Sequence, residues 1–332
     1  MRLNRFSTYT LASIALATSI VVILQGAVVR ATGSGAGCGS HWPSCNGQVV
    51  PLGHGTEAAI EFSHRLLSLV VLMLGAWLLA RATRSRRDRP GLFYWAAGSF
   101  AFLLVEALLG AMTVLLGYTG ENVSTGRGVL VAVHLVNSLL LVGALTGTVL
   151  YARDRAPAWP LRLGRQSMLA TVLSVGLLGM LVLMFSGGIA AMGSTMFPSE
   201  SLAEGLAADF DAGSHPLIRL RILHPVIAVT VGIYLFLSLG LAWLLKPVPR
   251  ARALTRVLTV VYLVQLGVGT LNFAMLAPVV LQLLHLALAV AAFALLSAVS
   301  VTALGYPATA PAPDLTRGEA PGDSAATPLE NY

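Results

Sequence analysis

The chain has 332 residues, of which 56% are hydrophobic and 11% are charged, and its mean hydropathy is +0.79. This composition excludes a soluble globular domain and indicates a polytopic membrane protein. The formal net charge of +7 comes from basic residues that flank hydrophobic segments, so it indicates membrane topology and not the binding of nucleic acid.

We predict an all-α membrane protein with eight transmembrane helices. Each predicted span has about the 20 apolar residues that ~30 Å of hydrocarbon requires. The sixth span is long enough to project beyond the membrane or to bend at Pro225, a proline within the helical pattern. The spans are approximately 8–29, 58–80, 91–117, 128–151, 166–190, 216–245, 255–274 and 277–304.

Basic residues set the expected orientation. Most of the 21 Lys and Arg residues fall on one side of the predicted spans, including a run of five arginines within 81–89. The positive-inside rule therefore places both termini in the cytoplasm. The first span follows a short basic segment but lacks a signal-peptidase site, so we expect it to remain as a mature helix.

The loop after the first span carries both cysteines of the chain, Cys38 and Cys45, on the predicted outer face. Six residues separate them, so a disulfide is geometrically reasonable and compatible with an oxidising compartment. The bridge could be a structural staple or a redox-active dithiol, since exposed bridges of small loops can be labile. A zinc site is less favoured because the spacing fits no standard finger; its ligands would be Cys38, His41, Cys45 and His54.

Four of the seven histidines lie inside predicted spans, three to eight residues after an even-numbered span begins. At ~1.5 Å per residue they lie at similar depth, roughly 5 to 12 Å from the outer end of each span. An ionisable residue in the membrane is costly and indicates function by default, although any one of them could be structural. Four at matched depth are typical of axial haem-iron ligands: His64, His134, His224 and His285.

Glu61 precedes His64 by three positions, so both side chains share one helix face. A carboxylate there could act as a general base, stabilise positive charge on an oxidised carbon, or hydrogen-bond a bound oxygen species. The alternative is a helix-end residue that favours the helix dipole.

An internal repeat divides the chain into two halves, 1–151 and 152–304. Residues 25–28 resemble 186–189, and residues 105–110 resemble 264–269, so that His64 pairs with His224 and His134 with His285. Because each half has an even number of spans, the repeat is parallel, about an axis along the membrane normal. We expect two four-helix bundles, each with two facing histidines.

Other repeated positions have two possible roles. The glycines at the repeated helix ends could serve close helix packing or contact a haem. Glu106 and Gln265 lie near mid-span and should face the bundle interior, where interhelical hydrogen bonding is the favoured role. The segment 305–332 is rich in Pro, Ala, Thr, Asp and Glu, and we expect a disordered cytoplasmic tail.

The segments 32–38 (Thr-Gly-Ser-Gly-x-Gly-Cys) and 42–47 (Trp-Pro-x-Cys-x-Gly), with Glu-x-Ser-His-Arg at 61–65, closely resemble the haem A synthase family, over about residues 8–304. The resemblance implies an enzyme of the bacterial cytoplasmic membrane that oxidises the C8 methyl of haem O to the formyl group of haem A. It implies as partners a haem O synthase, a haem A-containing oxidase or its assembly factors, and a membrane electron donor.

The resemblance also assigns roles to residues. It implies that His64 and His134 line the site for the substrate haem O, and that His224 and His285 ligate a haem b cofactor. Glu61 matches the catalytic glutamate of the family. The two cysteines, Cys38 and Cys45, match an external pair thought to help redox chemistry or haem transfer.

The second half departs from better-known members. Its external loop, 192–215, has no cysteine where some relatives carry a second pair, and Pro225 follows His224 where an arginine is common. We therefore expect the haem propionates of this half to be anchored differently, near Arg219 and Arg221.

Two other classes of protein would also use such histidines. One is an electron-transfer cytochrome with two bis-histidine haems, and the other is a non-enzymatic haem carrier or oxidase assembly factor. Neither needs an acid beside a ligand. Glu61, together with a cysteine loop found in the first half alone, favours the enzyme.

Overall fold

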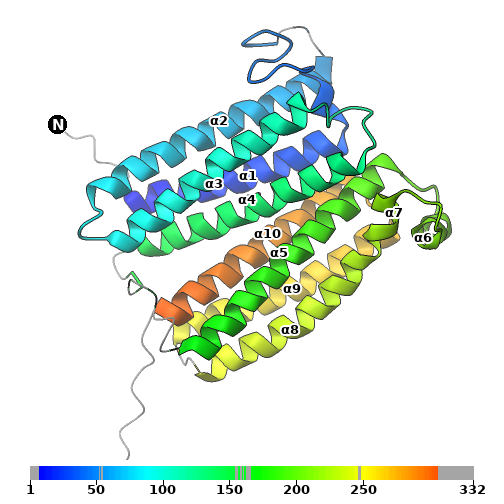
Figure 1. Cartoon of the computed structure of the whole chain (residues 1–332). Coiled ribbons are helices and arrows are strands. Elements are labelled where there is room, and N and C mark those ends of the chain that lie inside the picture. The colour runs from blue at the N-terminus through cyan, green and yellow to red at the C-terminus, as the bar shows by residue number, and fades with distance from the viewer. Residues whose placement is uncertain are drawn as a thin grey trace, which may run out of the picture.

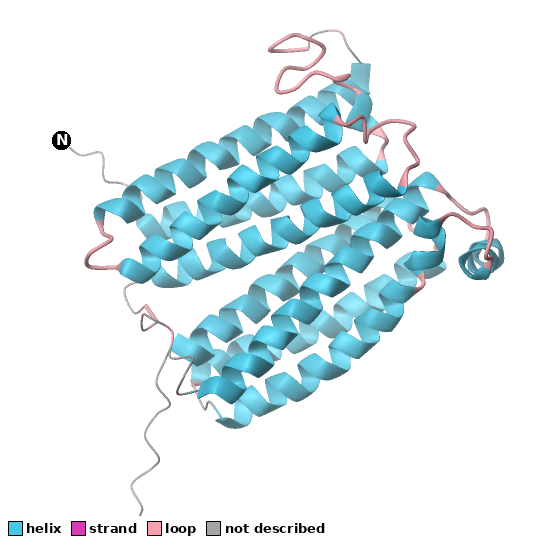
Figure 2. Ribbon diagram, in the orientation of Figure 1, coloured by secondary structure: helices cyan, strands magenta, loops and turns pink. Residues whose placement is uncertain are grey.

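The computed structural model describes residues 7–51, 53, 55–153, 156–157, 159, 161, 166–245 and 248–305. The described part is helical and has no β-strand apart from an isolated bridge between Cys45 and Gln48; Figure 2 shows helices joined by short loops. The predicted disordered tail lies outside the described residues from position 306 onward.

Eight helical segments among the described residues are long and apolar enough to cross a membrane, which confirms the predicted fold class. The sixth of them consists of α7 and α8, and the short α6 lies in the loop before it. The elements are α1 (Thr8–Ala31), η1 (Ser34–Ala36), α2 (Gly55–Arg84), α3 (Pro90–Leu115), α4 (Thr125–Tyr151), α5 (Ser167–Met196), α6 (Leu202–Phe210), α7 (Pro216–Arg221), α8 (Leu223–Leu245), α9 (Pro249–Ala274) and α10 (Val279–Gly305).

Proline explains two features of the helix boundaries. The helix of the sixth span is interrupted at Ile222, three residues before Pro225, because Pro225 has no N–H to donate to the carbonyl of Arg221. The last helix begins two residues later than predicted. Leu276 and Ala277 have positive φ angles of 60° and 57°, and a residue before a proline, here Pro278, is disfavoured in the α-helical region.

The two halves lie side by side and use the same helix pairings (Figure 1). In the first half α1 packs on α2 and α4, and α3 packs on α4; in the second half α5 packs on α8 and α10, and α9 packs on α10. The halves meet through α4 and α10 and through two further contacts, α1 with α10 and α5 with α4, which the repeat relates to each other. This arrangement is the predicted parallel repeat with an approximate two-fold axis.

Small residues bring the halves together. A Cβ on Gly188 of α5 would lie 2.9 Å from the Cα of Ala132 in α4, which is closer than side chains approach. Such contacts between small residues are typical of helix packing in membranes. Arg30 also crosses the interface. Its guanidinium donates to the carbonyl of Ala191, which is the residue that the repeat relates to Arg30 itself, and to the side chain of Gln282 in α10. Arg30 therefore lies close to the two-fold axis.

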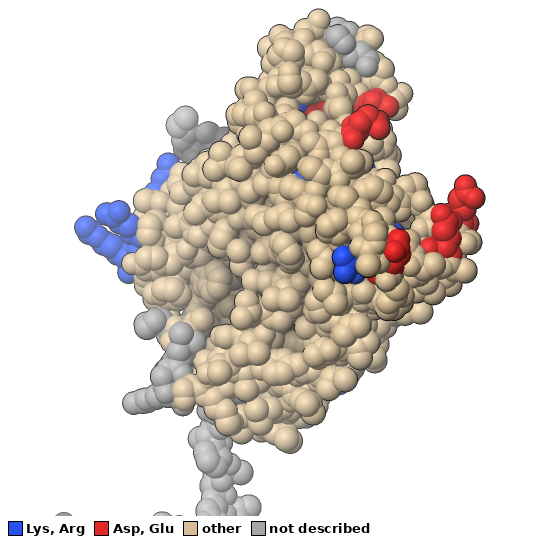
Figure 3. All heavy atoms as spheres, turned by 45° about the vertical axis from the view of Figure 1, so that its right-hand side comes forward, with Lys and Arg blue, Asp and Glu red and all other residues tan. Residues whose placement is uncertain are grey.

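Charge distinguishes the two ends of the helices. Figure 3 shows most exposed Lys and Arg side chains at one end and most exposed Asp and Glu side chains at the other. The first, called the basic end here, carries exposed Arg84, Arg86 and Arg87. The opposite end, called the loop end, carries the cysteine loop and α6, with exposed Glu200 and Glu204.

Candidate functional site

Each of the four histidine rings lies against a glycine of the preceding membrane-spanning helix in its half. The pairs are Gly26 with His64, Gly110 with His134, Gly187 with His224 and Gly269 with His285. A Cβ would lie 2.7 to 3.0 Å from Cε1 of the imidazole in three pairs, which requires the ring to shift, and 3.7 Å from it at Gly110, which is an ordinary contact. Three of the repeated glycines thus make room for the histidine rings, a role that the sequence pattern did not suggest.

The two histidines of the second half face each other. The ring centroids of His224 and His285 are 6.1 Å apart, and the ring planes are 84° from parallel. Metal–imidazole bonds are about 2 Å long, so two rings on opposite sides of one metal have centroids about 6 Å apart. The separation is therefore compatible with both imidazoles binding one haem iron.

A serine orients one of these rings. The Oγ of Ser186 lies 3.1 Å from Nδ1 of His224, and such a contact fixes the tautomer and orientation of a ligating imidazole. The repeat-equivalent residue in the first half, Gln25, donates to the Oγ of Ser63 instead of His64. Nδ1 of His64 and Nδ1 of His285 have no hydrogen-bond partner among the described residues.

Glu106 and Gln265 each lie against a candidate histidine ligand of the next helix; the predicted interhelical hydrogen bond is present for the side-chain nitrogen of Gln265, whereas neither oxygen of Glu106 has a hydrogen-bond partner among the described residues. Oε2 of Glu106 in α3 lies 2.5 Å from Nε2 of His134 in α4. The side-chain nitrogen of Gln265 in α9 lies 3.3 Å from Nε2 of His285 in α10. The first half therefore has a second carboxylate at its candidate site, and the sequence analysis gave it no functional role.

The cysteine loop is closed by a disulfide between Cys38 and Cys45. The zinc alternative is wrong for this loop because both sulfur atoms are in the bridge; His54 lies outside the described residues, and no group of three or more His, Cys, Asp or Glu side chains in the described part could hold a metal ion. The bridge is also not exposed, which was the reason for the redox-active alternative. Both cysteines are fully buried, against Ala58 and Phe62 of α2.

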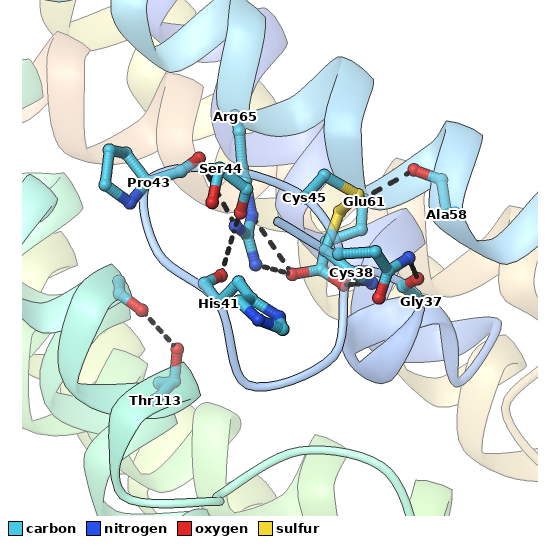
Figure 4. A network of polar contacts seen from close by, with 12 residues as sticks. Gly37, Cys38, His41, Pro43, Ser44, Cys45, Ala58, Glu61, Arg65 and Thr113 are labelled. Carbon is cyan, nitrogen blue, oxygen red and sulfur yellow. Dashed lines mark hydrogen bonds and ion pairs between the residues drawn. A yellow bond between two sulfur atoms is a disulfide. The ribbon is translucent and has the colours of Figure 1, made fainter. Parts of the chain in front are cut away.

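Glu61 holds this loop on α2 (Figure 4). Its side chain is buried, and Oε2 accepts a 2.8 Å hydrogen bond from the backbone N–H of Cys38. Oε1 pairs with the guanidinium of Arg65, one helical turn further along. Glu61 and His64 therefore lie on the same helix, and the carboxylate of Glu61 points towards the cysteine loop.

Arg65 is the residue that the sequence analysis left without a role. Its guanidinium pairs with Glu61, and its Nη1 also donates hydrogen bonds to two carbonyls of the loop, those of His41 at 2.7 Å and Ser44 at 2.6 Å. The spacing of four residues from Glu61 was the available signal, because such pairs face each other on a helix. The loop carbonyls could not be foreseen from spacing.

The second half places an ion pair at the corresponding position with the charges exchanged. Arg221 lies three residues before His224, as Glu61 does before His64, and it pairs with the buried Asp209 of α6. Nη2 of Arg221 also donates to the carbonyl of Gly205. Arg221 therefore holds α6 on α7, while Arg219 is exposed.

Comparison with known proteins identifies the family. Residues 9–297 match the family model described as cytochrome oxidase assembly protein (COX15-CtaA). The chain belongs to this family. Relatives named heme A synthase also match, which confirms the resemblance seen in the motifs. One from Alkalihalophilus pseudofirmus is 26% identical over 262 residues, 75% of this chain and 80% of that protein.

A longer relative matches the chain more closely. A protein from Thermus thermophilus named protoheme IX farnesyltransferase is 42% identical over 290 residues, which are 86% of this chain and 46% of that protein. A heme A synthase from Halalkalibacterium halodurans is 31% identical over 170 residues, 50% of this chain and 52% of that protein. The chain therefore spans about half the length of the Thermus relative.

Proposed function

We propose that the protein is a haem A synthase, which oxidises the C8 methyl of haem O to a formyl group. The observation that carries the proposal is the buried Glu61 carboxylate, held by Arg65 and Cys38 on the helix of His64. An electron-transfer cytochrome or a haem carrier needs iron ligands but no such acid.

In this proposal the first half, 1–151, binds the substrate and the second half, 152–304, holds the cofactor. His64 and His134 bind the iron of haem O, and His224 and His285 bind haem b. The geometry of the second pair supports this assignment because its ring separation suits one iron and Ser186 orients His224. Haem b, when bound, supplies one-electron transfer.

Glu61 is the proposed catalytic residue. Oxidation of a methyl group removes electrons from its carbon and builds positive charge there, so a fixed carboxylate in a medium of low dielectric stabilises it or activates the oxygen nucleophile. Arg65 and the Cys38 N–H fix the carboxylate in position before the substrate arrives. Preorganisation of this kind lowers the cost of reorganisation during the reaction.

Two arginines at the loop end suit the carboxylates of the haem propionates. Arg30 and Arg127 have no ion-pair partner among the described carboxylates. Arg127 is buried, and its Nη1 donates to the backbone carbonyls of Gly120 and Asn122. Buried cations are costly without a counter-ion, and propionates would supply one. Since Arg221 is paired with Asp209, we propose these two arginines in place of Arg219 and Arg221.

The charge distribution suggests where the site lies in the cell. The basic end would face the cytoplasm under the positive-inside rule, which places both termini inside and the histidines towards the outer face of a bacterial cytoplasmic membrane. The Thermus relative suggests a partner. A protein named protoheme IX farnesyltransferase shares the region matched here. We propose that a haem O synthase delivers the substrate and that a haem A-containing oxidase or its assembly factor receives the product.

Co-expression with a protoheme IX farnesyltransferase tests the function. We expect the purified protein to contain haem b together with haem O and haem A, as separated by chromatography of the extracted haems. Haem b alone, with haem O present in the same membranes, would contradict the proposal and favour a cytochrome or carrier.

A further inference from the structure

The short helix α6 exposes a row of apolar side chains. Leu202, Leu206 and Phe210 follow one another at intervals of four residues, which places them on one face of the helix, and they are 37%, 38% and 74% exposed. Glu204 lies two residues from both leucines, about 200° around the helix, so its exposed side chain is on the opposite face. The helix is therefore amphipathic, and its apolar face remains accessible in the described part of the chain.

A third side of α6 is fixed to the body of the protein. Gly205 and Asp209, one helical turn apart, are buried. Arg221 of α7 pairs with the carboxylate of Asp209 and donates a hydrogen bond to the carbonyl of Gly205. These contacts set the rotation of α6 about its axis, so the direction of the apolar face is defined by the fold.

The helix lies at the boundary of the membrane-spanning region. Residues 197–201 join it to the end of α5, and residues 211–215 join it to the start of α7. Figure 1 looks nearly along the axis of α6, whereas the membrane-spanning helices run across the view. A helix that crosses the direction of the spans at their ends has the orientation of an interfacial amphipathic helix. It packs on α7, which exposes Leu220 on the lipid-facing sixth span, as α8 exposes Leu223.

We propose that α6 is an interfacial helix, which inserts Leu202, Leu206 and Phe210 among the lipids of one leaflet and keeps Glu204 in water. Since α6 contains no Lys or Arg, the contact comes from burial of apolar surface and not from attraction to anionic headgroups. The bilayer therefore holds the loop between the fifth and sixth spans, and the Asp209–Arg221 pair joins that loop to α7.

A spin label on one introduced cysteine tests the contact. Both native cysteines are buried in the disulfide, so the label attaches to the introduced residue. The full chain carrying Leu206→Cys, or Glu204→Cys as the matched control, is reconstituted in phosphatidylcholine nanodiscs. Collision rates are then measured with oxygen, which concentrates in lipid, and with a water-soluble nickel complex. We expect the ratio of oxygen to nickel collisions to be several-fold higher at position 206 than at position 204, and anionic phosphatidylglycerol should change neither ratio.

Two results at position 206 would overturn the proposal. Frequent nickel collisions at both positions would show that the apolar face lies in water. Few collisions with either reagent at position 206 would show that protein covers this face, as in a contact between two copies of the chain. Phe210→Cys is a second test variant with the same expected result, for use if Leu206→Cys fails to fold. Gel filtration and thermal unfolding, compared with the unsubstituted protein, establish that each labelled variant is folded.

Discussion

The two halves share a scaffold and differ in the charges around the histidines. Glu61 lies three residues before His64 in the first half, and Arg221 lies three residues before His224 in the second. Each is paired, Glu61 with Arg65 of the same helix and Arg221 with Asp209 of α6. Both halves thus keep the glycines that lie against the histidine rings, but the residue three positions before His64 is acidic and the one three positions before His224 is basic. The difference teaches that the helix pairings position the ligands, while substitutions at a few equivalent places give each site its own chemistry.

The loops above the two sites differ in the same way. The first is a short loop closed by a disulfide and tied to α2 by Glu61 and Arg65. The second contains α6, which Ser201 caps by accepting from the backbone N–H of Glu204 and which Asp209 ties to Arg221. Both loops are therefore anchored by an acid and an arginine, but only the first anchor leaves a carboxylate on the helix of its histidine.

The largest effect should come from neutralising that carboxylate. Glu61→Gln keeps the size of the side chain and can still accept from the Cys38 N–H, but it deletes the charge. We expect haem A formation to fall by about 10² or more, as for loss of a positioned general base, with haem O or a hydroxylated intermediate accumulating and haem b content unchanged. The matched control is Glu57→Gln, an exposed glutamate one turn earlier in α2. A wild-type yield of haem A from Glu61→Gln would show that the charge of Glu61 is not what gives the first half its chemistry.

A smaller loss should follow from releasing Glu61 from its partner. Arg65→Gln removes the ion pair and the hydrogen bonds to the loop carbonyls, so we expect haem A formation to fall about tenfold, within the range for residues that orient a functional group. Arg65→Lys keeps the charge but not the planar fork and should recover part of the activity. Chromatography of extracted haems measures both. Equal activity of the Gln and Lys variants would show that the pair does not position Glu61.

The smallest effect should come from the disulfide. Both cysteines are buried, so a membrane-impermeant thiol reagent should label neither in native membranes, and labelling should require reductant together with denaturant. Replacing both with serine loosens the loop but keeps the backbone N–H that donates to Glu61, so we expect haem A formation to fall about fivefold or less, which is less than the loss of a whole hydrogen bond to a charged group would cause. Free labelling of two thiols without reductant would argue against the bridge.

Much of the fold and part of the site could be predicted from the sequence. Hydrophobic length fixes the eight spans, and local spacing brings Cys38 near Cys45. Contacts between segments could not be predicted. The partners of Arg65 are carbonyls of a loop more than 20 residues away, and Asp209 reaches Arg221 only because α6 folds back. The roles of the repeated glycines also depend on helix placement, because a glycine does not indicate which side chain it admits.

The central claim is that the first half handles substrate and the second half holds a permanent haem b. The most direct measurement is the haem b content of four purified single variants, co-expressed with a protoheme IX farnesyltransferase, in which each histidine is replaced by alanine. We predict that His224→Ala and His285→Ala lose haem b, whereas His64→Ala and His134→Ala keep it and lose conversion of haem O. Equal loss of haem b from all four variants would contradict the account.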